Sequence, residues 1–237
     1  MMVSTQSKIS GKSVVVTIDG PAGAGKSTTA KALAKRLGFF YLDTGAMYRA
    51  LTFKAMRQKV NLEDEDALVT LAKKTTIDLK EDGGLRVFVD GEDVSEEIRT
   101  VEVTNNTFYI ARAPKVREIM VNWQRAIGES RNTVVEGRDV GTVVFPKAAY
   151  KFYLDADLHE RSKRRIKELQ EKGKIVNERT IENEMKERDT KDLTRRVGPL
   201  KKAADAVLID STFLSVDQVT QRMFEYIEKK EVFVRHG

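Results

Sequence analysis

The segment at residues 20–27, "GPAGAGKS", constrains this chain more than any other. It satisfies the pattern G-x-x-x-x-G-K-[ST]. A β-branched run, "SVVVTI", precedes it, and a helical pattern rich in Lys, Ala and Leu follows it. Glycines at this spacing let backbone N–H groups point into one concavity, to which the helix N-terminus adds a partial positive charge. We therefore predict a loop that holds the phosphates of a nucleotide.

The end of this loop supplies chemistry that the backbone lacks. Lys26 is suited to reach the terminal phosphates, and the Ser27 hydroxyl is suited to ligate Mg²⁺. The chain has no cysteine and two histidines, so a structural zinc site is not expected and any metal should be Mg²⁺. Asp19 and Asp43 are weaker candidates for metal contacts through water. The predicted loop contacts to ATP are Gly20, Pro21, Ala22, Gly23, Ala24, Gly25, Lys26, Ser27 and Thr28.

Short apolar runs recur along the chain and predict buried strands. They lie at residues 13–18, 39–43, 133–139, 151–156 and 205–210. Helical patterns separate most of these runs, and strands that alternate with helices predict an α/β fold with a parallel sheet covered on both faces. The sequence therefore predicts one main domain.

Residues 63–100 interrupt this alternation. The stretch "TIDLKEDGGLRVFVDGEDVS" contains two alternating runs joined by "EDGG" and then "DG", which are hairpin signals. We predict a small antiparallel lobe inserted into a core made of residues 13–62 and 101–230. Residues 1–12 and 231–237 are predicted to be tails.

The net charge of +6 is distributed unevenly. Residues 158–202 hold 15 basic and 9 acidic residues, whereas residues 63–100 hold 5 basic and 12 acidic residues. The basic excess is therefore a local patch, which fits either a solvated helix face or a binding surface. The sequence contains no apolar run of about eighteen residues and no secretion signal, so we expect a cytoplasmic protein without a membrane segment.

The loop alone does not identify the group that receives the phosphate. The sequence lacks the N-K-x-D and D-x-x-G motifs that a GTPase needs. Two strand ends, "FYLDTGAMYR" and "VVEGRDVGTVVFP", place several polar groups where open α/β sheets bind their ligands. From the residues alone, "EGRD" fits a strand-end cluster of salt bridges equally well.

Five segments in one order carry a resemblance. They are "IDGPAGAGKST", "LDTGAMYRAL", "EGRDVGTVVFP", "LDADLHERSKRR" and "KERDTKDLTRRVGPLKKAADAVLIDST". Together they resemble bacterial cytidylate kinases, in register from Val14 to Lys229. The resemblance implies a P-loop NTPase fold with a five-stranded parallel sheet, an inserted nucleotide-binding lobe and a short lid at about residues 158–202. It also implies transfer of the γ-phosphoryl group of ATP to CMP or dCMP with Mg²⁺, by direct in-line attack.

The resemblance also assigns roles to residues outside the loop. It implies that Lys26, Arg138, Arg188 and Arg195 neutralise charge on the transferring group, and that Arg161 and Arg165 meet ATP. The implied CMP contacts are Thr44, Tyr48, Arg49, Arg117, Arg138, Asp139, Arg188 and Asp192. A carboxylate at Asp139 suits cytosine, because cytosine presents an N4 amino donor where uracil presents an acceptor.

One position departs from the pattern of that family. A serine that commonly helps to hold the base aligns, without a gap, on Phe108. Thr107 or Asn106 could supply a hydroxyl or an amide in its place, or Phe108 could pack on the base.

Two other functions stay open at this point. The first is a kinase for another small acceptor, such as UMP or shikimate. The second is a P-loop ATPase that binds nucleic acid through the basic segment, which predicts hydrolysis stimulated by RNA or DNA. We expect a monomer whose partners are ATP, CMP and dCMP, with no nucleic acid.

Overall fold

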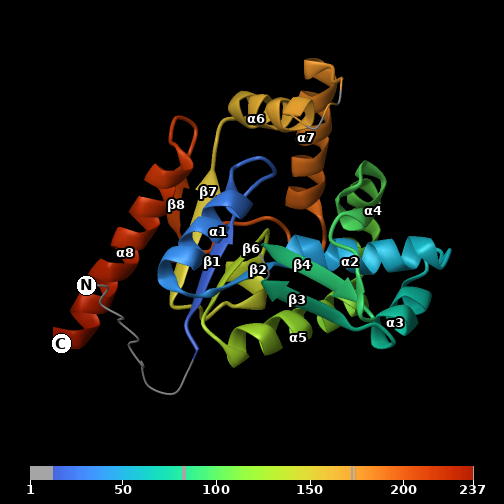
Figure 1. Ribbon diagram of the computed structural model, residues 1–237, viewed down its shortest axis with the longest axis horizontal. Helices are drawn as coiled ribbons and strands as arrows, with labels where there is room; N and C mark the ends of the chain where they lie inside the picture. The colour runs from blue at the N-terminus through green and yellow to red at the C-terminus, as the bar shows by residue number, and fades with distance from the viewer. Residues whose placement is uncertain (1–12, 82–83, 172, 174, 237) are drawn as a thin grey trace.

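The computed structural model describes residues 13–81, 84–171, 173 and 175–236 (Figure 1). A five-stranded parallel sheet with the order β2-β6-β1-β7-β8 forms its centre. The strands are β1 (Val15–Asp19), β2 (Phe40–Asp43), β6 (Thr133–Gly137), β7 (Tyr150–Asp155) and β8 (Val207–Asp210). All five predicted strands and their parallel arrangement are confirmed.

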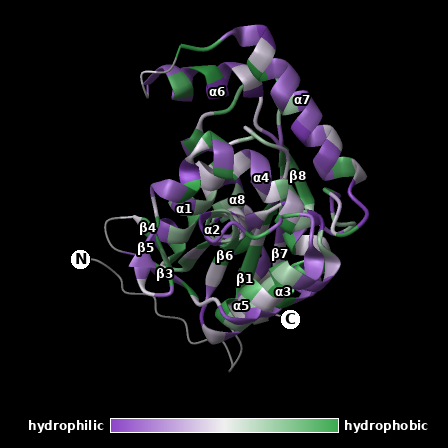
Figure 2. Ribbon diagram, turned by 90° about the vertical axis from the view of Figure 1, so that its right-hand side faces the viewer, coloured by the Kyte–Doolittle hydropathy of each residue, from purple (hydrophilic) through white to green (hydrophobic). Residues whose placement is uncertain are grey.

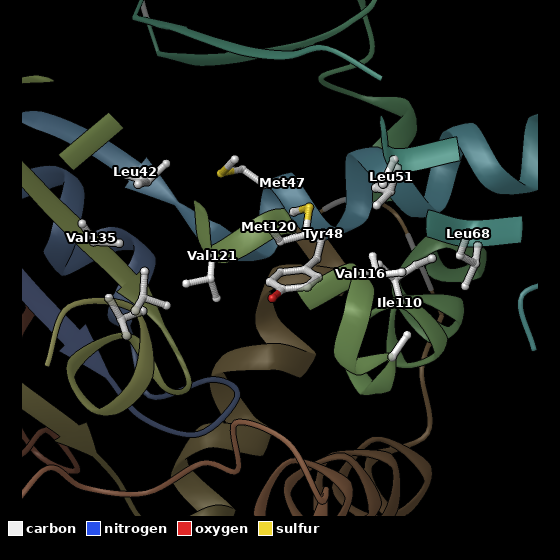
Figure 3. Packing of buried hydrophobic residues seen from close by; sticks show 14 of the residues in the cluster. Leu42, Met47, Tyr48, Leu51, Leu68, Ile110, Val116, Met120, Val121 and Val135 are labelled. Carbon is white, nitrogen blue, oxygen red and sulfur yellow. The ribbon is translucent and has the colours of Figure 1, made fainter. Parts of the chain in front are cut away.

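Helices cover both faces of this sheet, as the alternating pattern predicts (Figure 1). On one face, α1 (Lys26–Leu37) and α8 (Val216–His236) bury an apolar cluster against the strands. On the other face, α2 (Thr44–Arg57) and α5 (Pro114–Ser130) bury a second cluster, which Figure 3 shows around Met47, Met120 and Tyr48. Successive strand residues alternate between the two clusters because side chains alternate across a strand.

The insertion forms a separate antiparallel sheet with the order β3-β4-β5. Its strands are β3 (Ile77–Glu81), β4 (Leu85–Val89) and β5 (Glu92–Asp93). Asp90 and Gly91 have φ values of 53° and 86°, the left-handed conformations that a two-residue hairpin turn needs. The predicted hairpins are therefore confirmed.

Not all of residues 63–100 lies apart from the core. The helix α3 (Glu65–Lys73) buries Leu68 and Leu71 in the same cluster as α2 and α5. Beyond β5, a 3₁₀ turn at Glu97–Arg99 leads into α4 (Val101–Arg112). The boundaries assigned to the inserted lobe stay a prediction.

Two helices project from the carboxyl edge of the sheet and form the lid region. They are α6 (Leu158–Glu171) and α7 (Glu178–Thr194), which lie at the top of Figure 1. Figure 2 shows that α7 is hydrophilic along most of its length. The lid has its own small apolar cluster, which includes Ala22 of the loop after β1.

The ends of the chain differ from the sequence prediction in one respect. The predicted N-terminal tail, residues 1–12, lies outside the described residues. The predicted C-terminal tail instead continues α8 as far as His236. Among the residues that the structure describes, no helix has the length and apolar character needed to cross a bilayer.

Candidate active site

The loop between β1 and α1, residues 20–27, has the backbone geometry that its glycines predict. A β-carbon at Gly20 would overlap the carbonyl oxygen of Leu154, so only glycine fits this approach to β7. Gly25 caps the N-terminus of α1 with a φ of 90°, a conformation that glycine adopts at low cost. We call this segment the P-loop.

Lys26 lies at the start of α1, and its side chain folds back over the P-loop. Its ammonium donates to the carbonyl oxygen of Pro21 at 2.7 Å, and the residue is buried. Burial lowers the pKa of Lys26, and the positive charge of Arg138 lowers it further. Such a cluster of cations is arranged to receive an anion.

Arg188 approaches the same point from α7. The residue as a whole is exposed on α7, but its guanidinium is buried among charged groups, which include Arg138 and Asp192. The pKa of Arg188 is lowered to about 10, mainly by burial of its guanidinium and next by the charge of Arg138. The charges of Arg49 and Arg165 also lower it. Positive charge at this one region thus comes from five parts of the chain: the P-loop, α2, the segment after β6, α6 and α7.

Ion pairs hold the arginines opposite the P-loop. Arg138 donates to Asp192 at 2.7 Å, and Arg49 contacts Asp43 at 3.0 Å. Asp192 lies one helical turn beyond Arg188, so both face the same space, as their spacing predicts. We call Arg49, Arg138, Arg188 and Asp192 the acceptor wall.

The two weaker metal candidates from the sequence have other partners. Asp19 accepts hydrogen bonds from the backbone N–H groups of Val140 and Gly141, each at 2.7 Å. Burial raises its pKa to about 6. Asp43 accepts from the N–H of Ala46 at 2.8 Å and so caps α2. Asp19 therefore anchors the segment after β6, and Asp43 starts a helix.

Sequence reasoning missed Glu136, a buried carboxylate near the P-loop. It lies one residue before the end of β6, beside Ile18 of β1, and accepts from the hydroxyl of Tyr41 at 2.6 Å. Burial and then the charge of Asp43 raise its pKa, whereas Lys26 and the Ser27 hydroxyl lower it. The sequence does not reveal that Glu136 lies near Ser27, because the two residues are far apart in the chain. The pairing of β6 with β1 brings them together.

A second group of ion pairs lies where the resemblance places the base. Arg117 of α5 pairs with Asp139, and Arg195 contacts the other oxygen of Asp139 at 3.2 Å. The Arg117 guanidinium carbon lies 5.6 Å from the centre of the Tyr48 ring. Burial raises the pKa of Asp139, while Arg117 and Arg195 lower it.

The backbone closes around this group from two sides. Thr44 donates to the carbonyl oxygen of Glu136 at 2.7 Å, which joins the start of α2 to β6. Gly198 has a φ of 57°, and a β-carbon there would overlap the Asp139 carboxylate and the Arg117 guanidinium. The loop after α7 therefore lies directly on the Arg117–Asp139 pair.

Phe108 lies on α4, partly buried, between the inserted lobe and the lid. Its ring centre is 5.3 Å from the guanidinium carbon of Arg112 and 5.9 Å from the ammonium of Lys191 on α7. Thr107 donates to the carbonyl oxygen of Val103 at 2.7 Å, and Asn106 donates to that of Glu102 at 3.0 Å. Both polar alternatives to Phe108 are thus bonded within α4.

The lid arginines have partners of their own. Arg161 donates to the carbonyl oxygen of Ala22 at 3.0 Å and contacts Asp189 at 2.5 Å. Arg165 pairs with Glu168 at 2.8 Å along the surface of α6. Sequence reasoning missed Asp189, because only the folded chain brings it to the P-loop.

The structure thus brings most predicted site residues to one region. Lys26, Arg138, Arg188 and Asp192 interact through their charges, and Arg117, Asp139, Arg195 and Tyr48 form the neighbouring group. Arg161 instead lies against the P-loop backbone. The roles of these residues toward ATP and CMP stay predictions.

The sequence comparisons agree on one family. The family model for cytidylate kinase matches residues 16–229. A cytidylate kinase of Caldanaerobacter subterraneus is 50% identical over 91% of this chain and 95% of its own length. One from Klebsiella pneumoniae is 48% identical over 91% of this chain and 96% of its own length. A solved shikimate kinase from Acinetobacter baumannii has 14% identity and a TM-score of 0.47, and covers 92% of this chain and 94% of that chain.

Proposed function

We propose, since this chain belongs to the cytidylate kinase family, that it transfers the γ-phosphoryl group of ATP to CMP or dCMP. Beyond the family, one observation supports this reaction most directly. Lys26, Arg138 and Arg188 come from three separate elements, yet the charges of Arg138 and Arg188 both lower the pKa of Lys26, and the charge of Arg138 lowers that of Arg188. Two phosphate-bearing substrates that meet there would be bound by all three cations.

ATP and CMP would occupy opposite sides of this region. The backbone N–H groups of the P-loop would hold the ATP phosphates, with Arg165 on the lid side. The acceptor wall would bind CMP, with Arg49 and Arg138 on the phosphate and Arg188 and Asp192 on the ribose. Since Arg138 and Asp192 pair at 2.7 Å, the phosphate and ribose contacts are already oriented toward each other.

The reaction needs no covalent intermediate with the protein. A phosphate oxygen of CMP is anionic already and attacks the γ-phosphorus of ATP in line, so that ADP leaves. Positioning and neutralisation of charge then supply the rate enhancement. Lys26, Arg138, Arg188 and Arg195 would neutralise charge on the transferring group, and the lid helices would exclude water.

The residues near Ser27 fit a magnesium ion bound together with ATP. Ser27 is exposed at the start of α1, and its hydroxyl lies beside the buried Glu136 carboxylate. Ser27 would bind Mg²⁺ directly, and Glu136 would hold a water of its shell. The ion would neutralise phosphate charge. Mn²⁺ binding in the presence of ADP, followed by electron paramagnetic resonance, tests this site: Glu136→Gln should weaken it by about tenfold.

Asp139 would select the base. Its two oxygens are engaged by Arg117 and Arg195, but a carboxylate has about four lone-pair sites, so it can also accept from cytosine N4. Arg117 would contact the pyrimidine edge. Uracil would place its O4 acceptor against the same carboxylate and should be rejected.

We also propose a cytoplasmic monomer that does not bind nucleic acid. Several arginines and lysines of residues 158–202 are engaged within the chain. The pairs are Arg161–Asp189, Lys163–Glu160, Arg165–Glu168 and Arg195–Asp139. Because these side chains pair within the chain, they favour a role in the lid over binding to the phosphate backbone of a nucleic acid.

A coupled assay of ADP release tests the proposed function. CMP and dCMP should support turnover, and UMP, AMP and shikimate should support much less. RNA and DNA should leave ATP hydrolysis unchanged. Turnover that is faster with shikimate or UMP than with CMP, or hydrolysis stimulated by nucleic acid, would contradict the proposal.

A further inference from the structure

Both backbone polar groups of Ala22, in the middle of the P-loop, are bonded by lid side chains. Its carbonyl oxygen accepts from Arg161 of α6 at 3.0 Å, and its N–H donates to Asp189 of α7 at 3.3 Å. Arg161 and Asp189 also pair with each other at 2.5 Å. The three residues therefore form a closed ring of contacts between segments far apart in the sequence.

This ring is shielded from solvent and fixed at its base. The side chains of Arg161 and Asp189 are 8% and 13% exposed. The Nε of Arg161 also donates to the carbonyl oxygen of Ala156, at the end of β7, at 2.9 Å. Contacts between charged groups in such a site are stronger than neutral hydrogen bonds, so the ring restricts where Ala22 lies.

Apolar packing holds the lid helices against the same part of the loop. Ala22 belongs to a cluster with Ile166, Ile181 and Met185. A β-carbon at Gly23 would lie 2.8 Å from the Met185 methyl carbon and 3.1 Å from the Arg161 β-carbon. The P-loop thus has α6 and α7 directly over Ala22 and Gly23.

A glycine-rich loop needs such support. Glycine populates many backbone conformations, so the residues that follow Ala22 would lose considerable freedom when their N–H groups close on phosphate. Contacts that fix the loop before binding reduce this entropic cost. Asp189 directly follows Arg188 and lies about one helical turn before Asp192 on α7, so the helix that holds the P-loop also carries part of the acceptor wall.

We propose that Asp189 is a positioning residue for the donor nucleotide. Its carboxylate, oriented by Arg161, holds Ala22 and keeps the P-loop in the conformation that receives phosphates. That the nucleotide is ATP rests on the proposed function, whereas the support of the loop does not.

Calorimetric titration of ADP and CMP, each alone, tests this role without turnover. Asp189→Ala should weaken ADP binding by about tenfold or more and leave CMP binding within about twofold. Asp189→Asn keeps an oxygen for the Ala22 N–H but loses the charge, so ADP binding should fall by about threefold. The matched control is Glu187→Ala, an exposed acid on the same helix, which should behave as the parent.

A double-mutant cycle with Arg161→Met shows whether the two side chains act as a unit. The double variant should bind ADP no more than about twofold more weakly than Asp189→Ala. Additive losses, ADP affinity that stays at the parent value in both Asp189 variants, or equal losses of ADP and CMP would overturn the proposal. Circular dichroism establishes that each variant folds, and Asp189→Asn decides the question if the alanine variant does not.

The same preparations separate this proposal from the proposed function. The parent is assayed for phosphoryl transfer to CMP alongside the titrations. If it does not phosphorylate CMP but Asp189→Ala still loses ADP affinity, the proposed function fails and the role of Asp189 stands.

Discussion

The P-loop and the acceptor wall direct positive charge at the same region but are built in opposite ways. The P-loop is a single segment between β1 and α1, and even its lysine bonds within the loop, to Pro21. The acceptor wall takes Arg49 from α2, Arg138 from the end of β6 and Arg188 from α7. Ion pairs orient two of these arginines, Arg49 to Asp43 and Arg138 to Asp192.

This difference separates two ways of making a phosphate site. A contiguous loop uses backbone N–H groups, whose direction follows from local conformation. A wall of arginines uses side-chain charges, which need partners from other elements to hold them apart from one another. Substitutions in the P-loop should therefore lower the rate of phosphoryl transfer. Substitutions in the acceptor wall should weaken the use of one substrate more than that of the other.

The largest expected effect follows from removing the P-loop charge. Lys26→Ala should reduce kcat by roughly 10²-fold or more, because a fixed charge at the developing negative centre typically contributes a few kcal/mol. The fold should persist, since neighbouring cations already disfavour the charge on Lys26. The coupled assay measures kcat, and Lys35→Ala, an exposed lysine on α1, is the control. Near-normal turnover would refute the role of the P-loop.

In the acceptor wall, Arg188→Ala should affect the two substrates differently. Loss of a charge-assisted contact to the acceptor should reduce kcat/KM for CMP by roughly 10- to 100-fold. The KM for ATP should change by less than about threefold, because the P-loop contacts remain. Lys186→Ala serves as the control on the same helix. Equal losses for both nucleotides would instead indicate general damage to the lid.

Asp139→Asn tests the choice of base within the second ion-pair group. The amide keeps the shape but offers either an acceptor or a donor, so the CMP/UMP ratio of kcat/KM should fall by at least roughly tenfold. Most of the change should be lost CMP activity. Phe108 occupies a usual base-contact position, so Asp139 should carry a larger share of the discrimination. An unchanged ratio would mean that Asp139 serves only as the partner of Arg117 and Arg195.

The smallest expected effect concerns the loop that covers this group. Gly198→Ala should raise the KM for CMP by about fivefold, because a β-carbon displaces Asp139 and Arg117 at a cost of roughly 1 kcal/mol. Gly173→Ala is a matched control, since Gly173 also has a positive φ, 72°, but no atom within 4 Å of its β-carbon position. Equal changes in the two variants would attribute the effect to backbone strain alone.

Particular elements show how much of the fold can be predicted from the sequence. The short apolar runs predict all five strands of the central sheet, because buried parallel strands need continuous apolar residues. "DG" at residues 90–91 predicts a hairpin turn, which the two positive φ values confirm. By contrast, α3 lies in the region predicted as a separate lobe, yet its apolar face packs into the main core. A helix pattern reveals that one face is apolar, but not which element covers it.

The sequence by itself determined the P-loop, since its conformation depends on glycines and a helix start that are adjacent in the chain. It also determined which arginines and acids were available on α7, because helical spacing places residues 188, 192 and 195 together. Only the tertiary structure decided that Glu136 lies beside Ser27, that Asp189 reaches Ala22, and that Asp139 pairs with Arg117. A charged side chain can pair with any opposite charge within reach, and strand order and lid position decide which one that is.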